Sequence, residues 1–544
     1  MHKSLVAIVG LLMLVSSGCT VPDPEYCASS DDCTRIVGAA GGLPYICHPT
    51  RHICIAGVDG VCTSNDDCRD PSRPRCDTKI TNRCQPCVLA ENPDSCGHLK
   101  ATPYCSSVPG GDANATICVA CMGNKDCPFA TPICDNHACR KCNKHSDCEG
   151  TLNCESNSSS NNGASCTNSL VCIGATDLTA DKAGTCAQNG DGADGRVVYV
   201  HNTTDCSDTP AKAGTDVDHP FCTLKEAYLA ATSQLRRYVR VLDSSKYVRM
   251  GMDIDNTTIS FIGSPAPSLG INKAATIGAL GLAFYVINNG NATIDEFELV
   301  ENSANNTLVG CQGSIGGNPK IPTLTLRNSI LRGNTRRTDT TGPGIDLQNC
   351  RAQIYGNVIG LQSMSDLKTD APAFWIGLRA QAEFSLPTLY DISNNIIAGN
   401  WGQAVDLYAV ANSNLTFRFN TVVGNGRAGG FGGITCSNTA PVTISYSLLA
   451  GNTPMSGSQL DRAGNCKISQ LVVGTSESLV DPGLIKLAPD LTDAFYLMSS
   501  PANTDCCIDK AQPKVGETFP STDIRRTARP QGSGWDIGAF ELPQ

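Results

Sequence analysis

The sequence predicts an all-β chain in which a disulfide-rich, loop-dominated repeat region precedes a long β-solenoid. Two observations carry this prediction. Cysteines recur at fixed spacings in the N-terminal third, and apolar residues and asparagines recur in one register through the C-terminal half. A chain of 544 residues is also long enough for more than one domain. The two regions are therefore expected to form separate domains.

Residues 27–187 are the predicted cysteine-rich repeat region. A Cys-x5-Cys pair recurs here, and an aspartate precedes the second cysteine each time. The pairs are Cys27/Cys33, Cys62/Cys68, Cys121/Cys127 and Cys142/Cys148. Apolar runs are too short to bury a sizeable core, so cross-links must offset the conformational entropy lost on folding. The 22 cysteines divide into four modules of four and a last module of six, which indicates a string of small units.

A zinc site is the alternative for part of this region. Cys118-x2-Cys121 and Cys139-x2-Cys142 are separated by the spacing of a zinc ribbon. Two further cysteines interrupt the intervening loop with the module's own pattern, which favours disulfides. We therefore expect no metal and no cofactor.

Residues 195–480 are the predicted solenoid. One column of turn residues is Asn334, Gln362, Asn400, Asn425 and Asn452, and a second column, five positions earlier, is Ser329, Asn357, Asn395, Asn420 and Ser447. The repeats lie 25 to 38 residues apart, which suits β-coils whose variable part is loops on one face. Stacked asparagine side chains can hydrogen-bond along such a ladder, and asparagine tolerates the left-handed backbone of a turn.

These asparagine columns resemble the repeats of right-handed parallel β-helix proteins. The start of the solenoid adds a strand at 196–201, a loop between Cys206 and Cys222, a helix opened by a capping box at Thr223, and a strand at 238–242. This order is similar to the first coil of pectin-lyase-like proteins, in which a short amphipathic helix covers the open end. We expect a disulfide between the two cysteines. A β-sandwich is the alternative, but it would not keep five registers aligned.

Residues 481–544 are the predicted closing segment. It contains Asp481-Pro482-Gly483, a run from Ile524 to Pro530, and a final Asp536-Ile537-Gly538. These motifs resemble the C-terminal end of bacterial β-helix surface proteins of the choice-of-anchor class. Cys506-Cys507 departs from that pattern and is expected to add cross-links. The resemblance implies a surface location and no chemistry.

The N-terminus predicts export. Residues 1–18 contain an apolar stretch from Leu5 to Val15 and small residues before Cys19. The stretch is about half of the ~20 residues that a membrane-spanning helix needs, which is typical of a signal peptide. Small residues before a cysteine resemble the lipobox of bacterial lipoproteins. The resemblance implies a lipidated Cys19, a linker at 19–26, and an outer-membrane lipoprotein facing the cell surface or the periplasm. Cleavage that leaves Cys19 unmodified is the alternative.

The even cysteine counts indicate the redox compartment, and the net charge indicates which classes of partner are excluded. With Cys19 set aside, 22 cysteines lie in the repeat region and 8 lie after it. Even numbers favour a disulfide framework in an oxidising compartment. The net charge is −10 and no basic cluster occurs, which argues against nucleic acid as a partner. A surface or environmental polysaccharide is the partner that we expect.

A second register predicts a candidate site. Four strands after the turns alternate apolar and polar residues, so their polar residues should face outward. One expected outward column is Asp346, Gly377, Asp406 and Thr435, beside Gln348, Arg379 and Tyr408, with Trp375 and Trp401 close by. Carboxylates two coils apart would lie about 9–10 Å from each other, at the upper edge of the range for inverting glycosidases. Asp346 and Asp406 are therefore candidate catalytic residues. Trp375, Arg379, Trp401 and Tyr408 are candidate glycan-binding residues.

Three interpretations of this column stay open: a solvated outer face, a glycan-binding surface, and a polysaccharide hydrolase or lyase of the pectin-lyase-like fold. No histidine follows His219, which argues against a polygalacturonase-like site. Arg525 and Arg526 are expected to lie far from the coils. Aromatic residues make up 5% of the chain, which argues against a long polysaccharide cleft. We therefore favour a non-catalytic adhesin or glycan-binding surface protein.

Overall fold

The computed structural model describes residues 45–47, 54–56, most of 62–142 and most of 197–543. The predicted signal peptide, linker and lipidation site at Cys19 lie outside the described residues, as does the expected domain boundary between 187 and 195. The chain divides into two compact units, Met1–Lys141 and Cys142–Gln544. None of the helices in the described segments is long and apolar enough to cross a membrane.

The first unit contains small modules, and two disulfides hold each module together. In each module the first cysteine bonds the third and the second bonds the fourth. The pairs are Cys62–Cys76 with Cys68–Cys84, Cys87–Cys105 with Cys96–Cys118, and Cys121–Cys134 with Cys127–Cys139. The predicted modules of four cysteines are confirmed for these three.

An antiparallel hairpin closes each of these modules. The hairpins are β3 (Arg75–Asp77) with β4 (Arg83–Gln85), β5 (Tyr104–Ser107) with β6 (Thr116–Val119), and β7 (Ile133–Asp135) with β8 (Ala138–Arg140). Nearer the N-terminus, β1 (Tyr45–Cys47) pairs with β2 (Cys54–Ala56) in the same way. Short antiparallel pairs of this kind are marginal by themselves, so the disulfides carry much of the stability of these modules.

The aspartate that recurs before a cysteine closes a short 3-10 helix. Asp67 ends η1 (Asn65–Asp67) and accepts a hydrogen bond from the Ser64 N–H at 3.1 Å. Asp126 ends η2 (Asn124–Asp126) and accepts one from the Gly123 N–H at 3.0 Å. These contacts satisfy a backbone donor that a helix N-terminus otherwise leaves open. They explain why the aspartate recurs with the cysteine spacing.

The zinc alternative is wrong. Cys118 bonds Cys96, Cys121 bonds Cys134, and Cys139 bonds Cys127. Metal ions bind the thiolate form of cysteine, and sulfurs that are already bonded to each other do not offer it. The close groups of sulfur atoms in these modules are therefore adjacent disulfides.

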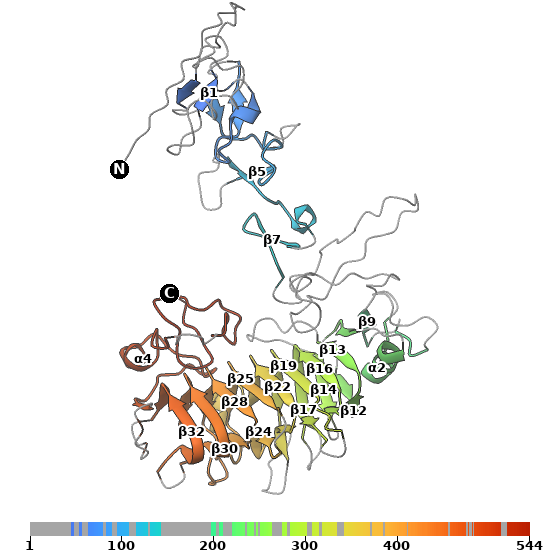
Figure 1. The fold of residues 1–544 in the computed structure, drawn as a ribbon, viewed down its shortest axis with the longest axis vertical. Coiled ribbons are helices and arrows are strands. Elements are labelled where there is room, and N and C mark those ends of the chain that lie inside the picture. The colour runs from blue at the N-terminus through green and yellow to red at the C-terminus, as the bar shows by residue number, and fades with distance from the viewer. Residues whose placement is uncertain are drawn as a thin grey trace, which may run out of the picture. The chain divides into compact units, whose positions relative to one another are not determined.

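The second unit is a parallel β-helix in which each full coil adds one strand to each of three parallel sheets (Figure 1). The first sheet contains β9 (Val197–Val200), β10 (Tyr238–Val241), β13 (Thr258–Ile262), β16 (Asn291–Asp295), β19 (Thr323–Arg327), β22 (Arg351–Tyr355), β25 (Leu389–Ser393) and β28 (Asn414–Arg418). The second contains β11 (Lys246–Val248), β14 (Ala275–Ala279), β17 (Phe297–Glu301), β20 (Ile330–Arg332), β23 (Val358–Gly360), β26 (Ile396–Ala398), β29 (Thr421–Val423), β31 (Leu448–Ala450), β33 (Leu471–Val473) and β34 (Leu484–Lys486).

The third sheet contains β12 (Met252–Asp255), β15 (Phe284–Ile287), β18 (Val309–Gln312), β21 (Pro343–Gln348), β24 (Ile376–Ala382) and β27 (Val405–Ala409). Two long strands, β30 (Ile434–Ser445) and β32 (Leu460–Ser469), run on from the third sheet into the first. One continuous apolar core fills the coil between the sheets. The predicted parallel β-solenoid is confirmed.

Two columns of buried side chains join successive turns. In the first column each backbone N–H donates to the side-chain oxygen of the next member, at N···O distances of 2.9–3.1 Å. The members are Ser329, Asn357, Asn395, Asn420 and Ser447. In the second, Asn400, Asn425 and Asn452 donate likewise, ending at Gln459. The predicted ladders are confirmed over these coils. Asn334 lies outside the described residues, and Gln362, a predicted member, makes no side-chain amide hydrogen bond to Asn400.

In these turns the residue just before the ladder residue adopts the left-handed backbone conformation. Gly399, Gly424 and Gly451 precede the second ladder with φ of 62°, 62° and 61°, and Asn394, Phe419 and Tyr446 precede the first with φ of 55°, 54° and 50°. The expectation that the ladder asparagines themselves adopt this conformation is therefore wrong. Glycine takes it without steric cost. In the first column, the rings of Phe419 and Tyr446 stack with centroids 5.0 Å apart.

Helix α2 (Leu224–Ser233) covers one end of the coil beside β9 and β10 (Figure 1). Thr223 Oγ1 accepts a hydrogen bond from the Glu226 N–H at 3.3 Å, as expected for an N-cap. Leu224 and Ala227 are fully buried, and Tyr228 packs against the core. The predicted disulfide between Cys206 and Cys222 is present in the loop before the helix.

The C-terminal segment covers the outside of the second sheet. Phe495, Ile524 and Ala539 pack on apolar residues of β20, β23, β26 and β29. Arg526 donates to Glu296 Oε1 at 2.6 Å, so the expectation that this arginine lies far from the coils is wrong. Cys506, at the end of α4 (Pro501–Cys506), bonds its neighbour Cys507. These two residues therefore add one disulfide, as expected, and it links neighbouring residues of the same turn.

The first ladder predicts a large local cost for Asn395→Ala. The Asn395 amide nitrogen donates to the carbonyl oxygens of Ile354 at 2.7 Å and Ser393 at 2.9 Å and to Asn420 Oδ1 at 3.0 Å. Alanine would leave these buried acceptors without a donor, so we expect the free energy of unfolding to fall by about 2–4 kcal/mol. Denaturant unfolding of the full chain measures this loss. Asn289→Ala, at an exposed asparagine, is the control; an equal loss for both variants would contradict the role of the ladder.

Candidate functional site

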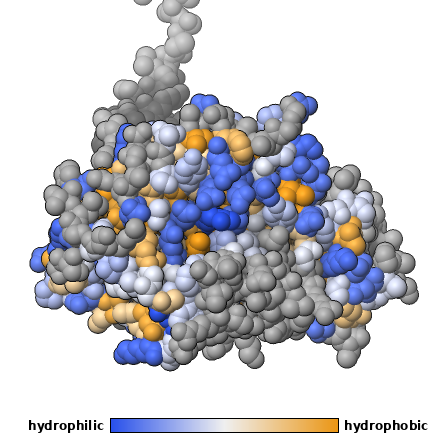
Figure 2. Space-filling view, turned by 90° about the horizontal axis from the view of Figure 1, so that it is seen from below, coloured by the Kyte–Doolittle hydropathy of each residue, from blue (hydrophilic) through white to orange (hydrophobic). Residues whose placement is uncertain are grey.

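The outer face of the third sheet carries two polar columns. Backbone partners along one column are Asp253, Tyr285, Gly310, Asp346, Arg379, Asp406, Thr435 and Asp461, and along the other Asp255, Ile287, Gln312, Gln348, Gln381, Tyr408 and Ser437. The strand residues between them are buried. Asp346 and Asp406 therefore face outward, as predicted. We call these two columns the polar face; Figure 2 shows hydrophilic residues gathered in a band across the side of the molecule seen there.

Arg379, and not Gly377, lies between the two candidate carboxylates. Asp346 is the backbone partner of Arg379, which is in turn the partner of Asp406. Two strand spacings separate the aspartates, which corresponds to about 9–10 Å. The expected column placed Gly377 at this position, two residues too early in β24. A shift of two residues keeps every apolar side chain facing inward, so the alternating pattern could not reveal the error.

The Arg379 guanidinium donates two hydrogen bonds to the Asp346 carboxylate. Nε donates to Oδ1 at 2.9 Å and Nη2 donates to Oδ2 at 2.6 Å. Gln348 adds a third donor to Oδ2 at 3.0 Å. A paired guanidinium and carboxylate of this geometry is strong and fixes both side chains, and the bonds to Asp346 raise the pKa of Arg379. Both carboxylate oxygens of Asp346 therefore already accept hydrogen bonds from neighbouring side chains.

Asp406 has a different environment. The Gln381 amide donates to its Oδ2 at 3.1 Å. Burial raises the pKa of Asp406, while the hydrogen bond from Gln381 and the charge of Arg379 oppose that rise. The two outward aspartates of this column thus have different hydrogen-bond donors, a guanidinium for Asp346 and an amide for Asp406. Gln381, which the sequence reasoning did not single out, links this residue to the second column.

The aromatic candidates do not form one platform. Tyr408 lies on the polar face beside Gln381 and is partly exposed. Trp375 is partly buried, just before β24, and its backbone accepts a hydrogen bond from the Gly402 N–H at 3.0 Å. Trp401 is 2% exposed, so its ring is not available to stack on a ligand. The expectation that Trp401 contributes to a binding surface is wrong.

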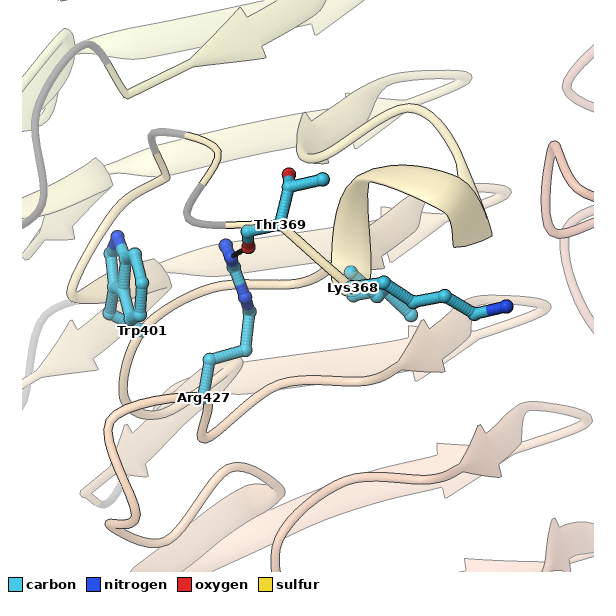
Figure 3. Close-up of a pocket in the computed structure, with 5 residues that line it drawn as sticks. Lys368, Thr369, Trp401 and Arg427 are labelled. Carbon is cyan, nitrogen blue, oxygen red and sulfur yellow. Dashed lines mark hydrogen bonds between the residues drawn. The ribbon is translucent and has the colours of Figure 1, made fainter.

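Trp401 instead belongs to the wall of a small hollow of about 440 Å³. Leu367, at the end of α3 (Met364–Leu367), lines it together with Lys368, Thr369 and Arg427. Figure 3 shows Arg427 reaching between Trp401 and Thr369. Its guanidinium lies 4.1 Å from the centre of the Trp401 ring and donates to the carbonyls of Thr369, Ala371 and Gly399.

These contacts give the hollow a structural role. Arg427 uses its donors on the backbone of the loop that carries Thr369 and Ala371, and on the turn at Gly399. A guanidinium that stacks on an indole ring is further stabilised by the cation–π interaction. The arginine therefore ties the loop after α3 to the next two coils. The polar face is the better candidate for a functional site.

No family model, curated protein or solved structure matches the chain.

Proposed function

We propose that the chain is a surface protein whose polar face binds a glycan without cleaving it. The observation that carries this proposal is the Asp346–Arg379–Asp406 row, which lies beside Tyr408 on one outward surface. Carboxylates and amides fix sugar hydroxyls by directional hydrogen bonds, and a tyrosine ring offers an apolar surface to the sugar. Both kinds of group are present here, on strands that hold them rigidly.

The position of Arg379 favours binding over cleavage. An inverting hydrolase needs room for a water molecule and a sugar between its two carboxylates. Here the guanidinium of Arg379 stands in the row between Asp346 and Asp406, and Asp346 already accepts three hydrogen bonds. Asp346 is therefore badly placed to activate water.

The charge of the face points to the kind of glycan. Asp253, Asp255, Asp346, Asp406 and Asp461 all belong to the two columns, and Arg379 is the basic residue among their described members. This arginine is already paired with Asp346. An acidic surface repels anionic ligands. The proposal therefore specifies a neutral glycan and excludes polyuronates.

Polysaccharide hydrolysis is the second candidate. One observation favours it: burial raises the pKa of Asp406, as a general acid requires, while Asp346 is paired with a cation. The resemblance of the first coil to pectin-lyase-like proteins supports the same candidate. In this alternative Asp406 protonates the leaving oxygen and Asp346 acts as the base.

The binding proposal predicts that Tyr408→Ala weakens binding of the full chain to a neutral glycan by roughly two- to twelvefold, because a ring contact contributes about 0.5–1.5 kcal/mol. A panel of immobilised neutral and anionic polysaccharides finds the ligand, and titration of the variant measures the loss. Tyr355→Ala, at a partly exposed tyrosine on β22 of the first sheet, is the matched control and should bind normally.

Two results would contradict this proposal. If the chain binds none of the glycans, the proposed glycan-binding function is wrong. If Tyr408→Ala and Tyr355→Ala lose equal affinity, the assignment of the binding site to the polar face is wrong. Release of reducing ends that Asp406→Asn abolishes, with binding retained, would replace the proposal by the hydrolase. The binding proposal expects no product at any pH.

We further propose that the chain is an outer-membrane lipoprotein anchored through Cys19. The apolar stretch before this cysteine and the small residues next to it support the proposal. Disulfides in both described units also suit an oxidising compartment. The choice-of-anchor resemblance of the last residues agrees with a surface location.

Lipidation predicts that Cys19→Ala moves the chain from the membrane fraction to the soluble fraction of the expressing bacterium, because the acyl chains would be lost. Cell fractionation followed by immunoblotting measures the distribution. Thr20→Ala, next to the modified residue, should leave the chain in the membrane fraction. Membrane association that survives Cys19→Ala would overturn the lipoprotein proposal.

A further inference from the structure

Two cysteines inside the β-helix stand next to each other without a bond. Of the eight cysteines after residue 197, six form the disulfides Cys206–Cys222, Cys436–Cys466 and Cys506–Cys507. The remaining two, Cys311 and Cys350, are thiols that are 1% and 0% exposed. Burial and the neighbouring Cys350 thiol both raise the pKa of the Cys311 thiol, and both residues belong to the same buried core cluster. Each sulfur therefore has the other as its immediate neighbour within the apolar core.

The backbone around the two thiols is well fixed. Cys311 is the partner of Leu347 in the pairing of β18 with β21, and Cys350 follows three residues later at the turn. The Cys350 N–H donates to the Tyr390 hydroxyl at 3.2 Å, which donates to the Gln381 carbonyl oxygen at 3.0 Å. The two cysteines thus lie on adjacent coils, beneath the strands that carry the polar face.

The same chain already contains a disulfide with this arrangement. Cys436 on β30 is the partner of Arg462 on β32, and it bonds Cys466, four residues further along that strand. Both of its cysteines are buried in the same core. Cys311 and Cys350 repeat this relation between two earlier coils, with an offset of three residues in place of four.

We propose that Cys311 and Cys350 form a disulfide in the exported protein, which cross-links two adjacent coils beneath the polar face. The oxidant is a disulfide donor, either a protein thiol oxidase or a small-molecule disulfide. One thiolate attacks a donor sulfur and forms a mixed disulfide, and the second thiolate then displaces the donor. The donor leaves as a dithiol or two thiols, carrying the two electrons and, after protonation, the two protons.

The timing of this step follows from burial. Burial raises the pKa of the Cys311 thiol far above its usual range, and exchange requires the thiolate. Tyr390 and the apolar core enclose both sulfurs, so a donor has no access once the coil has closed. The bond therefore forms before the coil closes during folding.

Thiol labelling of the full chain tests the proposal. The chain is exported through its own N-terminus in a bacterium, purified without reductant, denatured, alkylated and digested for mass spectrometry. We expect no alkylation of Cys311 or Cys350 and one cross-linked peptide pair, lighter by about two hydrogen masses than the two free-thiol peptides together. Alkylation of both residues, or a bond from either to another cysteine, would overturn the proposal.

Variants with a single cysteine replaced test which cysteine is bonded to which. Cys311→Ala should release one new alkylated thiol, at Cys350, and Cys350→Ala should release one at Cys311. Cys436→Ala, in the disulfide that the structure already contains, is the matched control and should release Cys466. A Cys311→Ala chain in which Cys350 is no more reactive than in the unsubstituted chain contradicts the pairing. The unsubstituted chain decides the question even if a variant does not fold.

Discussion

The buried ladder of side-chain amides is the interaction on which the β-helix depends. Asn395 and Asn400 flank β26, and Asn420 and Asn425 flank β29, so the two ladders hold both ends of these second-sheet strands. The side chain of a ladder asparagine such as Asn395 accepts from an N–H of the preceding coil and donates to a backbone carbonyl of that same coil, while its own N–H donates to the side chain of the next coil. In a low-dielectric core an unsatisfied polar group is costly, so one misplaced coil would leave several donors and acceptors unpaired.

This constraint positions the polar face. The ladders align the turns at each end of the second sheet, and the chain then enters the third sheet through loops of variable length. Register there rests on strand pairing and on side-chain pairs such as Arg379 with Asp346 and Gln381 with Asp406. The bidentate pair makes the face rigid and also occupies the space between the candidate carboxylates. The features that favour binding over cleavage thus follow from the register of β21, β24 and β27.

The sequence predicted the ladder columns, the cap at Thr223 and the cysteine modules, because each depends on a short spacing that survives without tertiary context. It misplaced Arg379 by two residues, since alternation in a strand looks the same after such a shift. It also placed Trp401 on the surface, because that ring packs against Leu361 and Ala373 of the coil before it and under Arg427 of the coil after it. The left-handed residues Phe419 and Tyr446 carry no local signal, because bulky side chains rarely adopt that conformation.

Hydrogen exchange at the turn amides tests the role of the ladders most directly. The N–H groups of Asn395, Asn400, Asn420 and Asn425 donate to buried side chains of the next coil. If these side chains hold the turns, peptides that cover residues 394–400 and 419–425 should exchange as slowly as the core strands, although they contain the turns between sheets. Turn amides that exchange as fast as the exposed loops, while the strands stay protected, would show that strand pairing alone sets the coil and would contradict the account.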